Sequence, residues 1–275
     1  MRFVLIFLSM RQNHLPHSHP CRYFFHRTVN QLYSSSAQFP RTVLITGGSR
    51  GIGAACVRTF TERGCQVAFF YEKSHELANA LAADTGARAI CVDIADRAAV
   101  FAAVEALVGE WGAISCLVNN AGIAQFSLFT DITEADWSRM IGVNLSGVFY
   151  CTQAALPGMI REKYGRIINI SSIWGLTGAS CEVHYSAAKA GVIGLTRALA
   201  KELGPSGITV NCVAPGVIET EMNAALDDQT RAALCEETPL GCIGTPEDIA
   251  KAVLYFADAP FVTGQILSPN GGIVI

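Results

Sequence analysis

The chain has 275 residues, of which 51% are apolar and 16% charged, so it can bury a large core and is not a disordered protein. Its net charge of −3 gives no electrostatic reason to expect nucleic acid as a partner. Its ten cysteines include no C-x-x-C pair and no cysteine–histidine group with zinc-ligand spacing. We therefore expect no metal, and thiols that suit a reducing, cytoplasmic compartment.

The first forty residues differ in composition from the rest of the chain. They contain four arginines, four of the six histidines and no acidic residue, so the remainder is net acidic. The apolar run at residues 3–10 is too short to span a membrane, and no clear cleavage site follows it. We interpret residues 1–40 as a poorly ordered extension, with a targeting peptide as the alternative, and residues 41–275 as one domain with no membrane partner.

Strands and helices are predicted to alternate from residue 42 onward. Short apolar, β-branched runs predict strands at 42–46, 66–71, 88–92, 115–118, 166–170, 208–213 and 264–267. Helical spacing and terminal glycines predict helices at 52–63, 76–83, 98–111, 134–144, 185–203 and 246–256, with a further helix that continues from 144 towards 161. This order predicts an α/β fold, a Rossmann-type doubly wound parallel sheet with helices on both faces. Ligands bind such a sheet beyond the carboxyl ends of its strands.

A glycine-rich loop, T-G-G-S-R-G-I-G at residues 46–53, follows the first strand and opens the first helix. Glycine permits the tight turn and lets the backbone approach a pyrophosphate, while the helix N-terminus offers free N–H groups to the anion. A plain structural turn is the alternative, but the strand–loop–helix context favours a dinucleotide. The expected contacts are Gly47, Ser49, Arg50, Gly51, Ile52 and Gly53.

The type of dinucleotide is predicted from charge. An NAD site usually has an acid at the end of the second strand, which here ends in Tyr71, with Glu72 one place late. Arg50, inside the glycine loop, can pair with a 2′-phosphate. These positions favour NADP(H) over NAD(H), with Tyr71 as a further contact, while Glu72 is the feature that argues the other way.

Two more strand ends carry candidate cofactor residues. Asp93, after the third strand, can accept a hydrogen bond from the adenine amino group, and its alternative role is a helix N-cap. The N-N-A-G motif at residues 119–122 ends the fourth strand, where the amide of Asn120 can line the cofactor or bridge strands. A simple turn is the alternative for this motif.

Tyr185 and Lys189 are spaced i, i+4 and so share one face of a helix. A free tyrosine has a pKa of about 10 and is a poor proton donor or acceptor near neutral pH, but a desolvated ammonium beside it lowers that pKa. Ser172, directly after the fifth strand, has a hydroxyl that can orient a carbonyl oxygen. A surface helix pair is the alternative for Tyr185 and Lys189, and their position one element after Ser172 argues against it.

Four motifs together resemble the short-chain dehydrogenase/reductase family over residues 41–275. They are the glycine loop, the N-N-A-G motif, Ser172 thirteen residues before Tyr185, and Pro215-Gly216. The resemblance implies a Ser172–Tyr185–Lys189 active site with Asn144 as the fourth member. In that family the tyrosine protonates the carbonyl oxygen as hydride arrives, and the lysine lowers its pKa and holds the nicotinamide ribose.

The resemblance also implies further contacts and an assembly. The additional cofactor contacts it implies are Ile94, Asn120, Pro215, Gly216, Ile218 and Thr220. Residues 219–242 resemble the segment that forms a substrate lid. Members usually form homotetramers through their long helices, so a homotetramer is expected here.

Within the family, the chain most resembles 3-oxoacyl-[acyl-carrier-protein] reductases of fatty acid synthesis, on residues 207–211 and 270–272. The expected substrate is therefore a small carbonyl compound or an acyl thioester, possibly carried on acyl carrier protein. Residues 124–126 (A-Q-F) depart from that group's pattern. Lys163 keeps one basic residue where the carrier protein docks, while Ser206 stands where a second is expected.

Two alternatives stay open. Residues 173–175 and 178–184 resemble a bacterial subgroup linked to reduction of a 5-aminopentanone group on elongation factor P, in which case Glu182 would meet a cationic substrate. Glu182 is otherwise an exposed carboxylate at a helix start. The second alternative is a non-enzymatic cofactor-binding scaffold, which loss of Ser172, Tyr185 or Lys189 would have indicated; none is lost.

Overall fold

A parallel sheet forms the centre of the molecule in the computed structural model, which describes residues 39–223 and 227–275. Within these residues seven strands pair in the order β3-β2-β1-β4-β5-β6-β7. Their bounds are β1 Thr42–Thr46, β2 Gln66–Tyr71, β3 Arg88–Cys91, β4 Cys116–Asn119, β5 Gly165–Ile170, β6 Ile208–Val213 and β7 Ile266–Leu267. The order reverses between β1 and β4, which is where such a sheet opens a crevice for a ligand. The predicted fold class is confirmed.

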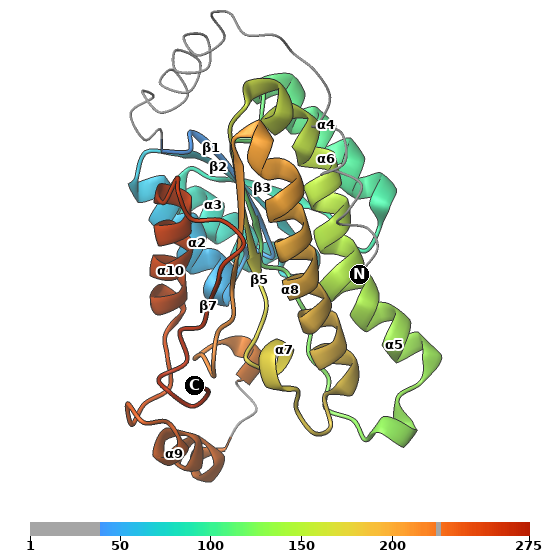
Figure 1. Cartoon of the computed structure of the whole chain (residues 1–275), viewed down its shortest axis with the longest axis vertical. Helices are drawn as coiled ribbons and strands as arrows, with labels where there is room; N and C mark the ends of the chain where they lie inside the picture. The colour runs from blue at the N-terminus through green and yellow to red at the C-terminus, as the bar shows by residue number, and fades with distance from the viewer. Residues whose placement is uncertain (1–38, 224–226) are drawn as a thin grey trace, which may run out of the picture. The chain divides into compact units, whose positions relative to one another are not determined.

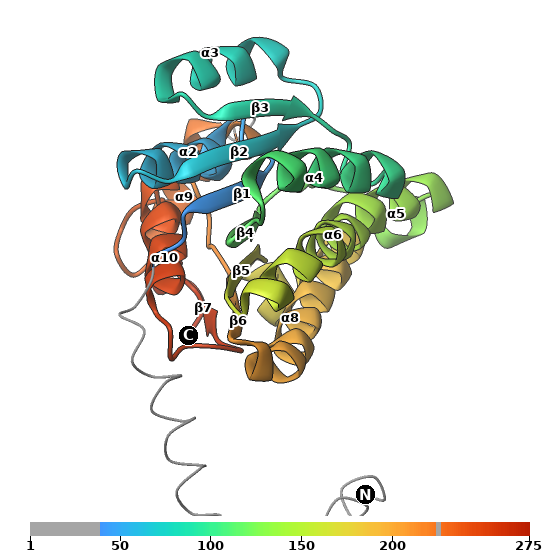
Figure 2. The same cartoon turned by 90° about the horizontal axis from the view of Figure 1, so that it is seen from above.

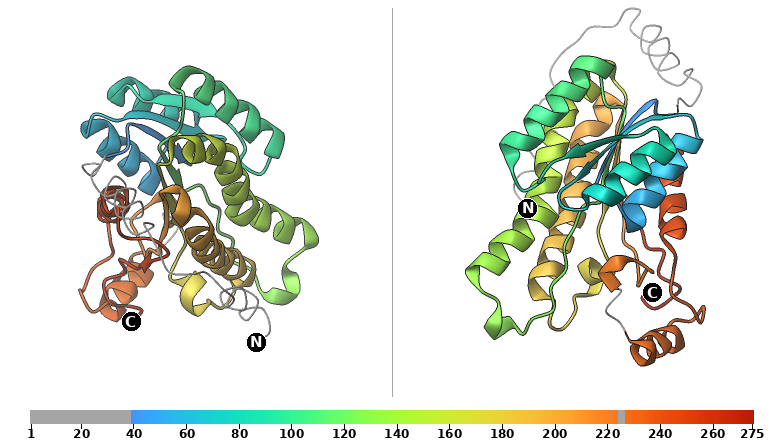
Figure 3. Two further views of the ribbon diagram at one scale, coloured as in Figure 1. Left: turned by 45° about the horizontal axis from the view of Figure 1, so that its top comes forward. Right: turned by 180° about the vertical axis from the view of Figure 1, so that it is seen from behind.

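Helices cover both faces of this sheet (Figure 2). On one face lie α2 (Gly51–Glu62), α3 (His75–Thr85) and α10 (Pro246–Asp258), and on the other α4 (Arg97–Trp111), α6 (Gly147–Glu162) and α8 (Val183–Leu203). The shorter α5 (Glu134–Ile141), α7 (Trp174–Thr177) and α9 (Asp228–Glu237) complete the described helices. In Figure 1, α7 and α9 lie beyond the same end of the sheet, and Figure 3 shows this arrangement from two further sides.

The strands are apolar because both of their faces are covered. Along β1, Ile45 packs in the core beneath α2 and α10, while its neighbour Leu44 packs in the core beneath α4 and α6. The central strands β5 and β6 are buried along their whole length. This is the pattern expected of a parallel sheet, and it explains why runs without polar alternation predicted these strands correctly.

Several helices begin at side-chain caps that the sequence provides. Asp96 accepts hydrogen bonds from the first turn of α4, and Thr133 and Thr245 form capping boxes with Asp136 and Asp248 at the starts of α5 and α10. These caps satisfy N–H groups that a helix start otherwise leaves without a partner. They also fix where α4 and α5 begin beside the candidate site.

The structure corrects several element boundaries. The helix predicted at 134–144 stops being α-helical after Ile141, and a π-helical turn, η2 (Gly142–Ser146), joins α5 to α6 without a loop. The final strand is shorter than predicted, and α7 and α9 were not predicted as helices. Short helices in loops carry too few periodic residues to be recognised, and a π-turn has no sequence period of its own.

Some predictions lie outside the described residues. They are the poorly ordered extension or targeting peptide, apart from residues 39 and 40, and residues 224–226 of the expected lid. Within the described part of the chain, no helix is long and apolar enough to cross a membrane, and no group of three potential ligand residues could hold a metal ion. The nine cysteines in the described ranges carry free thiols, of which Cys56, Cys116, Cys151 and Cys212 are buried.

Candidate active site

A cleft of about 610 Å³ lies at the carboxyl ends of the strands, where the strand order reverses. Its lining includes every residue predicted for the site except Gly53 and Asn144, which lie directly behind it. Segments far apart in the sequence therefore meet at one place. We call the part formed by residues 47–52, 71–73 and 93 the glycine-loop end, and the part around Ser172, Tyr185 and Lys189 the tyrosine end.

The glycine loop is packed so closely that a side chain would not fit at Gly47 or Gly53. A Cβ at Gly53 would lie 2.1 Å from the carbonyl oxygen of Gly47, and one at Gly47, where φ is +66°, would lie 2.7 Å from the Cα of Ala121. Helix α2 begins at Gly51 with no side-chain cap and no acidic residue in its first turn. Its N–H groups and positive dipole end are therefore available to an anion.

Asn120 ties the glycine loop to the end of β4. Its side-chain Nδ2 donates to the carbonyl oxygens of Thr46 and Gly47, each at 3.0 Å. In return, the hydroxyl of Thr46 accepts from the backbone N–H groups of Asn120 and Ala121. Of the two roles predicted for Asn120, the structure shows bridging between strand ends, and the residue also lines the cleft. These bonds fix the position of the loop relative to the end of β4.

Asp93 lines the glycine-loop end but does not cap the next helix. That cap is Asp96, whose carboxylate accepts from Ala98 and Ala99. The carboxylate of Asp93 instead accepts from the backbone N–H of Ala95 at 2.9 Å and from Arg139 at 2.6 Å. Asp93 is therefore placed for a ligand, with its orientation fixed from two sides.

At the tyrosine end, three polar side chains converge from two elements. Tyr185 and Lys189 lie one turn apart on α8, and the Lys189 ammonium is 5.6 Å from the centre of the Tyr185 ring. Ser172 follows β5, and its hydroxyl is near enough to the Tyr185 side chain to favour the phenolate and lower the phenol's pKa. The Lys189 Nζ donates to the carbonyl oxygen of Ile170 at 2.9 Å, which orients the ammonium. All three side chains are buried.

Burial sets the protonation of this end. It raises the pKa of Tyr185 to about 12, with the Ser172 hydroxyl opposing the rise and the Glu182 charge adding to it. It also lowers the pKa of Lys189 to about 8. The sequence predicts that the ammonium lowers the pKa of the phenol; in the structure, desolvation of the phenolate is the largest influence and the pKa is raised instead. Tyr185 is consequently a protonated acid at neutral pH, able to give a proton rather than to take one.

Asn144 lies in the π-turn η2, fully buried behind the cleft. Its amide accepts from the backbone N–H of Ile123 at 3.0 Å and donates to the Ile123 carbonyl at 2.8 Å. A Cβ at Gly122 would lie 2.8 Å from Asn144 Oδ1 and 3.3 Å from Lys189 Nζ, so the two side chains flank one point of the backbone. The side chain of Asn144 therefore positions the loop after β4, while its expected part in the active site stays a prediction.

The segment after β6 also forms part of the cleft wall. It includes Pro215, Gly216, Ile218 and Thr220, the residues that the resemblance implies as cofactor contacts, and all four line the cleft. A Cβ at Gly216 would lie 2.7 Å from the Cα of Asn270, so this segment is packed closely against the chain's last residues. The lining continues through residues 221–223, the described start of the expected lid.

Two residues in and beside the cleft, Arg139 and Gln125, have contacts that the sequence does not predict. Arg139 lies in the last turn of α5 and reaches across to Asp93 and Glu72, and no local motif marks it. Gln125 lines the cleft, where Asp136 accepts from its Nε2 at 3.1 Å, and its Oε1 lies 3.4 Å from a ring nitrogen of buried His184. Both pairings join segments far apart in sequence, so spacing could not reveal them.

The residues present fit a nicotinamide dinucleotide. The glycine loop leaves no room for a side chain at Gly47 or Gly53 and presents an uncapped helix start, which suits the pyrophosphate. Lys189 and the segment around Pro215 lie at the other end of the same cleft, where a nicotinamide ribose would be held. The cleft also opens on the tyrosine end, so a substrate carbonyl would reach Ser172 and Tyr185.

Comparison with known proteins agrees with this geometry. Residues 47–274 match the family model described as "Enoyl-(Acyl carrier protein) reductase". The chain is 40% identical over 240 residues to the 3-oxoacyl-[acyl-carrier-protein] reductase FabG of Chlamydia trachomatis, covering 85% of this chain and 97% of that protein. It is 41% identical to the protein of that name from Staphylococcus aureus, over 85% of this chain and 98% of that one. The protein of that name from Vibrio cholerae is 38% identical, over 85% of this chain and 97% of that one.

Proposed function

The chain belongs to the short-chain dehydrogenase/reductase family and is an oxidoreductase acting on a carbonyl or alcohol group, and from this premise we propose that it reduces 3-oxoacyl thioesters with NADPH. One observation carries the proposal: Ser172, Tyr185 and Lys189 meet at one end of a cleft whose other end is the glycine loop. A hydride donor and a carbonyl can therefore be held side by side. The relatives' printed activity supplies the substrate class.

The chain's own residues supply the proton and the orientation. The nicotinamide supplies the hydride when bound. Ser172 and Tyr185 donate hydrogen bonds to the carbonyl oxygen, and Tyr185 then gives its proton to that oxygen as negative charge develops there. The Lys189 ammonium, buried beside the phenol, stabilises the phenolate that remains. Burial excludes bulk water, so these interactions act in a medium of low dielectric constant.

A preference for NADPH over NADH is supported by Arg50. This arginine lines the cleft at the helix start and forms no ion pair with another residue in the described ranges, which leaves its guanidinium for a 2′-phosphate. Glu72, the feature that argues for NADH, also lines the cleft, but its carboxylate is paired with Arg139. Arg50 therefore offers an uncompensated positive charge to a 2′-phosphate.

We further propose that the acyl substrate is bound to a carrier protein. The relatives are named for acyl-carrier-protein substrates. Lys163 is exposed at the C-terminus of α6, where it can meet an acidic partner, while Ser206 offers no second positive charge. We therefore expect carrier-bound substrates to be reduced, with weaker docking than two basic residues would give.

A substrate and cofactor panel tests the proposal. Acetoacetyl-coenzyme A is offered with NADPH and with NADH, and oxidation of the nucleotide is followed by absorbance. We expect turnover with NADPH to exceed turnover with NADH, and acetoacetyl-carrier protein to give a lower KM than the coenzyme A thioester. Tight binding of NADPH with no turnover of any 3-oxoacyl thioester would contradict the proposed substrate class.

A second candidate substrate is a carbonyl compound that carries an amine, such as the 5-aminopentanone group on elongation factor P. The observation that favours it is Glu182, which lines the cleft and is partly buried, so that burial raises the pKa of its carboxyl. A cationic group would be attracted to this carboxylate. Reduction of an aminoketone that exceeds reduction of its uncharged analogue, and loses this advantage in Glu182→Gln, would select this candidate.

A homotetramer is proposed as the assembly. Large apolar side chains lie exposed on several described elements, among them Phe149 on α6, Tyr255 on α10, and Phe261 and Ile275 near the C-terminus. Apolar surface of this kind is often covered by a further subunit. Light scattering coupled to size exclusion is expected to give four times the 29.4 kDa chain mass, and a monomer mass would contradict the assembly.

A further inference from the structure

We propose that Arg139 is a positioning residue that sets the cofactor preference by neutralising and orienting Glu72. The inference rests on the proposed function, since it concerns the nucleotide that the cleft would hold. It adds a residue that does not itself line the cleft and that comes from α5, outside the glycine loop and outside the end of β2.

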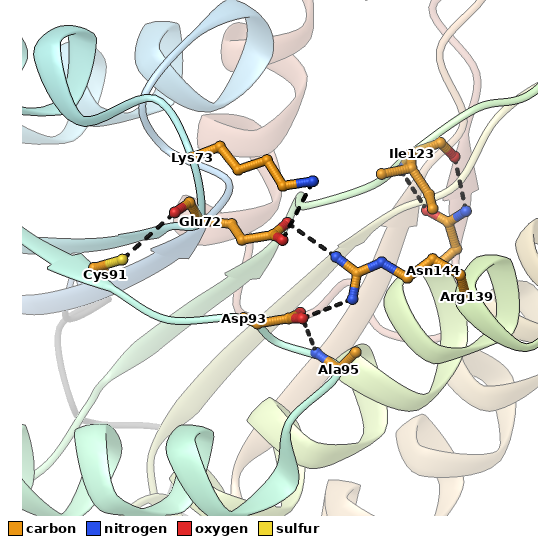
Figure 4. A network of polar contacts seen from close by, with 8 residues as sticks. All are labelled: Glu72, Lys73, Cys91, Asp93, Ala95, Ile123, Arg139 and Asn144. Atoms are coloured by element: carbon orange, nitrogen blue, oxygen red, sulfur yellow. Dashed lines mark hydrogen bonds and ion pairs between the residues drawn. The ribbon is translucent and has the colours of Figure 1, made fainter.

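The guanidinium of Arg139 bridges two carboxylates of the glycine-loop end (Figure 4). One of its nitrogens lies 2.9 Å from a Glu72 oxygen and another lies 2.6 Å from an Asp93 oxygen. The other oxygen of Glu72 lies 3.6 Å from Lys73 Nζ, and the other oxygen of Asp93 accepts from Ala95. Both carboxylates are thus held from two directions, with Arg139 as the contact they share.

This bridge decides what charge the cleft presents near a ribose 2′-position. A free carboxylate just after β2 accepts hydrogen bonds from ribose hydroxyls and repels a 2′-phosphate. Paired with Arg139, the Glu72 carboxylate carries a compensated charge and points toward α5. Arg50 can then act on the 2′-phosphate without an opposing negative charge beside it. The predicted conflict between Glu72 and Arg50 is thereby resolved within the protein.

The position of Arg139 is firmly set by its helix. The capping box of Thr133 and Asp136 fixes the start of α5, and Arg139 stands in that helix's last turn. The helix continues directly into the π-turn that carries Asn144, which is bonded to the loop after β4. Arg139 is therefore presented by a helix rather than by a loop, and its side chain is already in contact with Glu72.

The test is direct titration of the full chain with NADPH and with NADH, following nicotinamide fluorescence in the absence of any carbonyl substrate. In Arg139→Met the Glu72 charge is uncovered, so we expect the ratio Kd(NADPH)/Kd(NADH) to rise about two- to tenfold, the range that a half-exposed charge pair allows. In the double variant Arg139→Met/Glu72→Gln that rise is expected to disappear. Glu72→Gln alone is expected to shift the ratio the opposite way, toward NADPH.

Two results would overturn the inference. One is an equal change in both dissociation constants in Arg139→Met, and the other is a shift that survives in the double variant, since Arg139 would then not act through Glu72. Should Arg139→Met fail to fold, absence of the opposite shift in Glu72→Gln decides against it. Arg88→Met, which breaks an exposed ion pair with Glu110 outside the cleft, is the matched control and is expected to leave the ratio unchanged.

These outcomes are separate from failure of the proposed function. A parent protein that binds neither nucleotide would contradict the proposed function itself. A parent that prefers NADH would contradict the proposed preference, yet the ratio in each variant could still be compared with the parent. The proposed role of Arg139 is tested only by comparing the ratio Kd(NADPH)/Kd(NADH) among the Arg139 and Glu72 variants.

Discussion

The two ends of the cleft are built in opposite ways. At the tyrosine end the working groups are buried: Lys189 is 4% exposed and Tyr185 9%. At the glycine-loop end the side chains of Glu72 and Arg139 are 38% and 37% exposed. Burial strengthens each polar interaction and shifts pKa values, whereas exposure lets water and salt screen them. The proposed catalysis and the proposed cofactor choice would therefore take place in different dielectric environments.

One continuous helical segment serves both ends. Arg139, in α5, pairs with Glu72 and Asp93 at the exposed end, and Asn144, five residues later in the π-turn, anchors the loop behind Lys189. Substitutions at the buried end should therefore cost orders of magnitude in rate. Substitutions at the exposed end should change selectivity with little effect on folding.

Tyr185→Phe is expected to produce the largest effect. Removing the phenolic proton donor should lower kcat by about 10²- to 10⁴-fold, the range for loss of a general acid. The ring remains, so the Kd for NADPH should change little. The measurement is steady-state reduction of acetoacetyl-coenzyme A beside a fluorescence titration of the nucleotide. Tyr255→Phe, on the exposed face of α10, is the control and should retain parental kcat; a retained kcat in Tyr185→Phe would refute the assigned acid.

Gly53→Ala tests whether the burial of a residue, rather than the end of the cleft at which it lies, determines how much its substitution lowers stability and nucleotide binding. Gly53 lies directly behind the glycine-loop end and is buried, and its new Cβ would lie 2.1 Å from the Gly47 carbonyl oxygen. We expect a loss of about 1–3 kcal/mol in unfolding free energy, typical of overpacking, together with weaker nucleotide binding. Denaturant unfolding measures the first, and titration the second.

Gly109→Ala supplies the matched control for that variant. Gly109 is exposed in α4, and a Cβ added there would meet no neighbouring atom within 4 Å, so alanine should stabilise the helix by up to about 1 kcal/mol. Equal effects of the two substitutions would show that space in the glycine loop is not limiting.

The pH dependence of reduction should reflect Lys189. Its pKa is lowered to about 8, so the ammonium is lost as pH rises through that value, and the rate should fall toward about tenfold per pH unit above it. Tyr185, with a pKa of about 12, stays protonated over this range. In the unfolded chain the lysine keeps its proton to higher pH, so this group makes folding more favourable as the pH rises above about 8. A fall in rate over this range therefore does not arise from unfolding caused by Lys189. A flat profile to pH 10 would contradict this assignment.

Much of the fold and site was predictable because it depends on local patterns. The apolar strands, the glycine loop and the i, i+4 pair Tyr185–Lys189 follow from spacing and from residue type. What spacing could not show is burial and contact across the sheet. The pKa of Tyr185 depends on everything packed around it, and the partners of Arg139 lie just after β2 and β3, well before it in sequence. The π-turn around Asn144 likewise has no signature of its own.

Arg139→Met is expected to have the smallest effect on stability, although it alters cofactor choice. Exposed ion pairs contribute about 0–1 kcal/mol, because water competes for both charges and the side chains lose freedom when they pair. The unfolding free energy should therefore fall by less than about 1 kcal/mol, whereas the shift in nucleotide selectivity remains measurable in the same sample.

Asn144→Ala is the buried counterpart on the same segment: it leaves the backbone N–H and C=O of Ile123 without their partner and should cost about 1–3 kcal/mol. If denaturant unfolding instead gave Arg139→Met the larger loss, the exposed end would be a structural support, and the division between a buried catalytic end and an adjustable selective end would not hold.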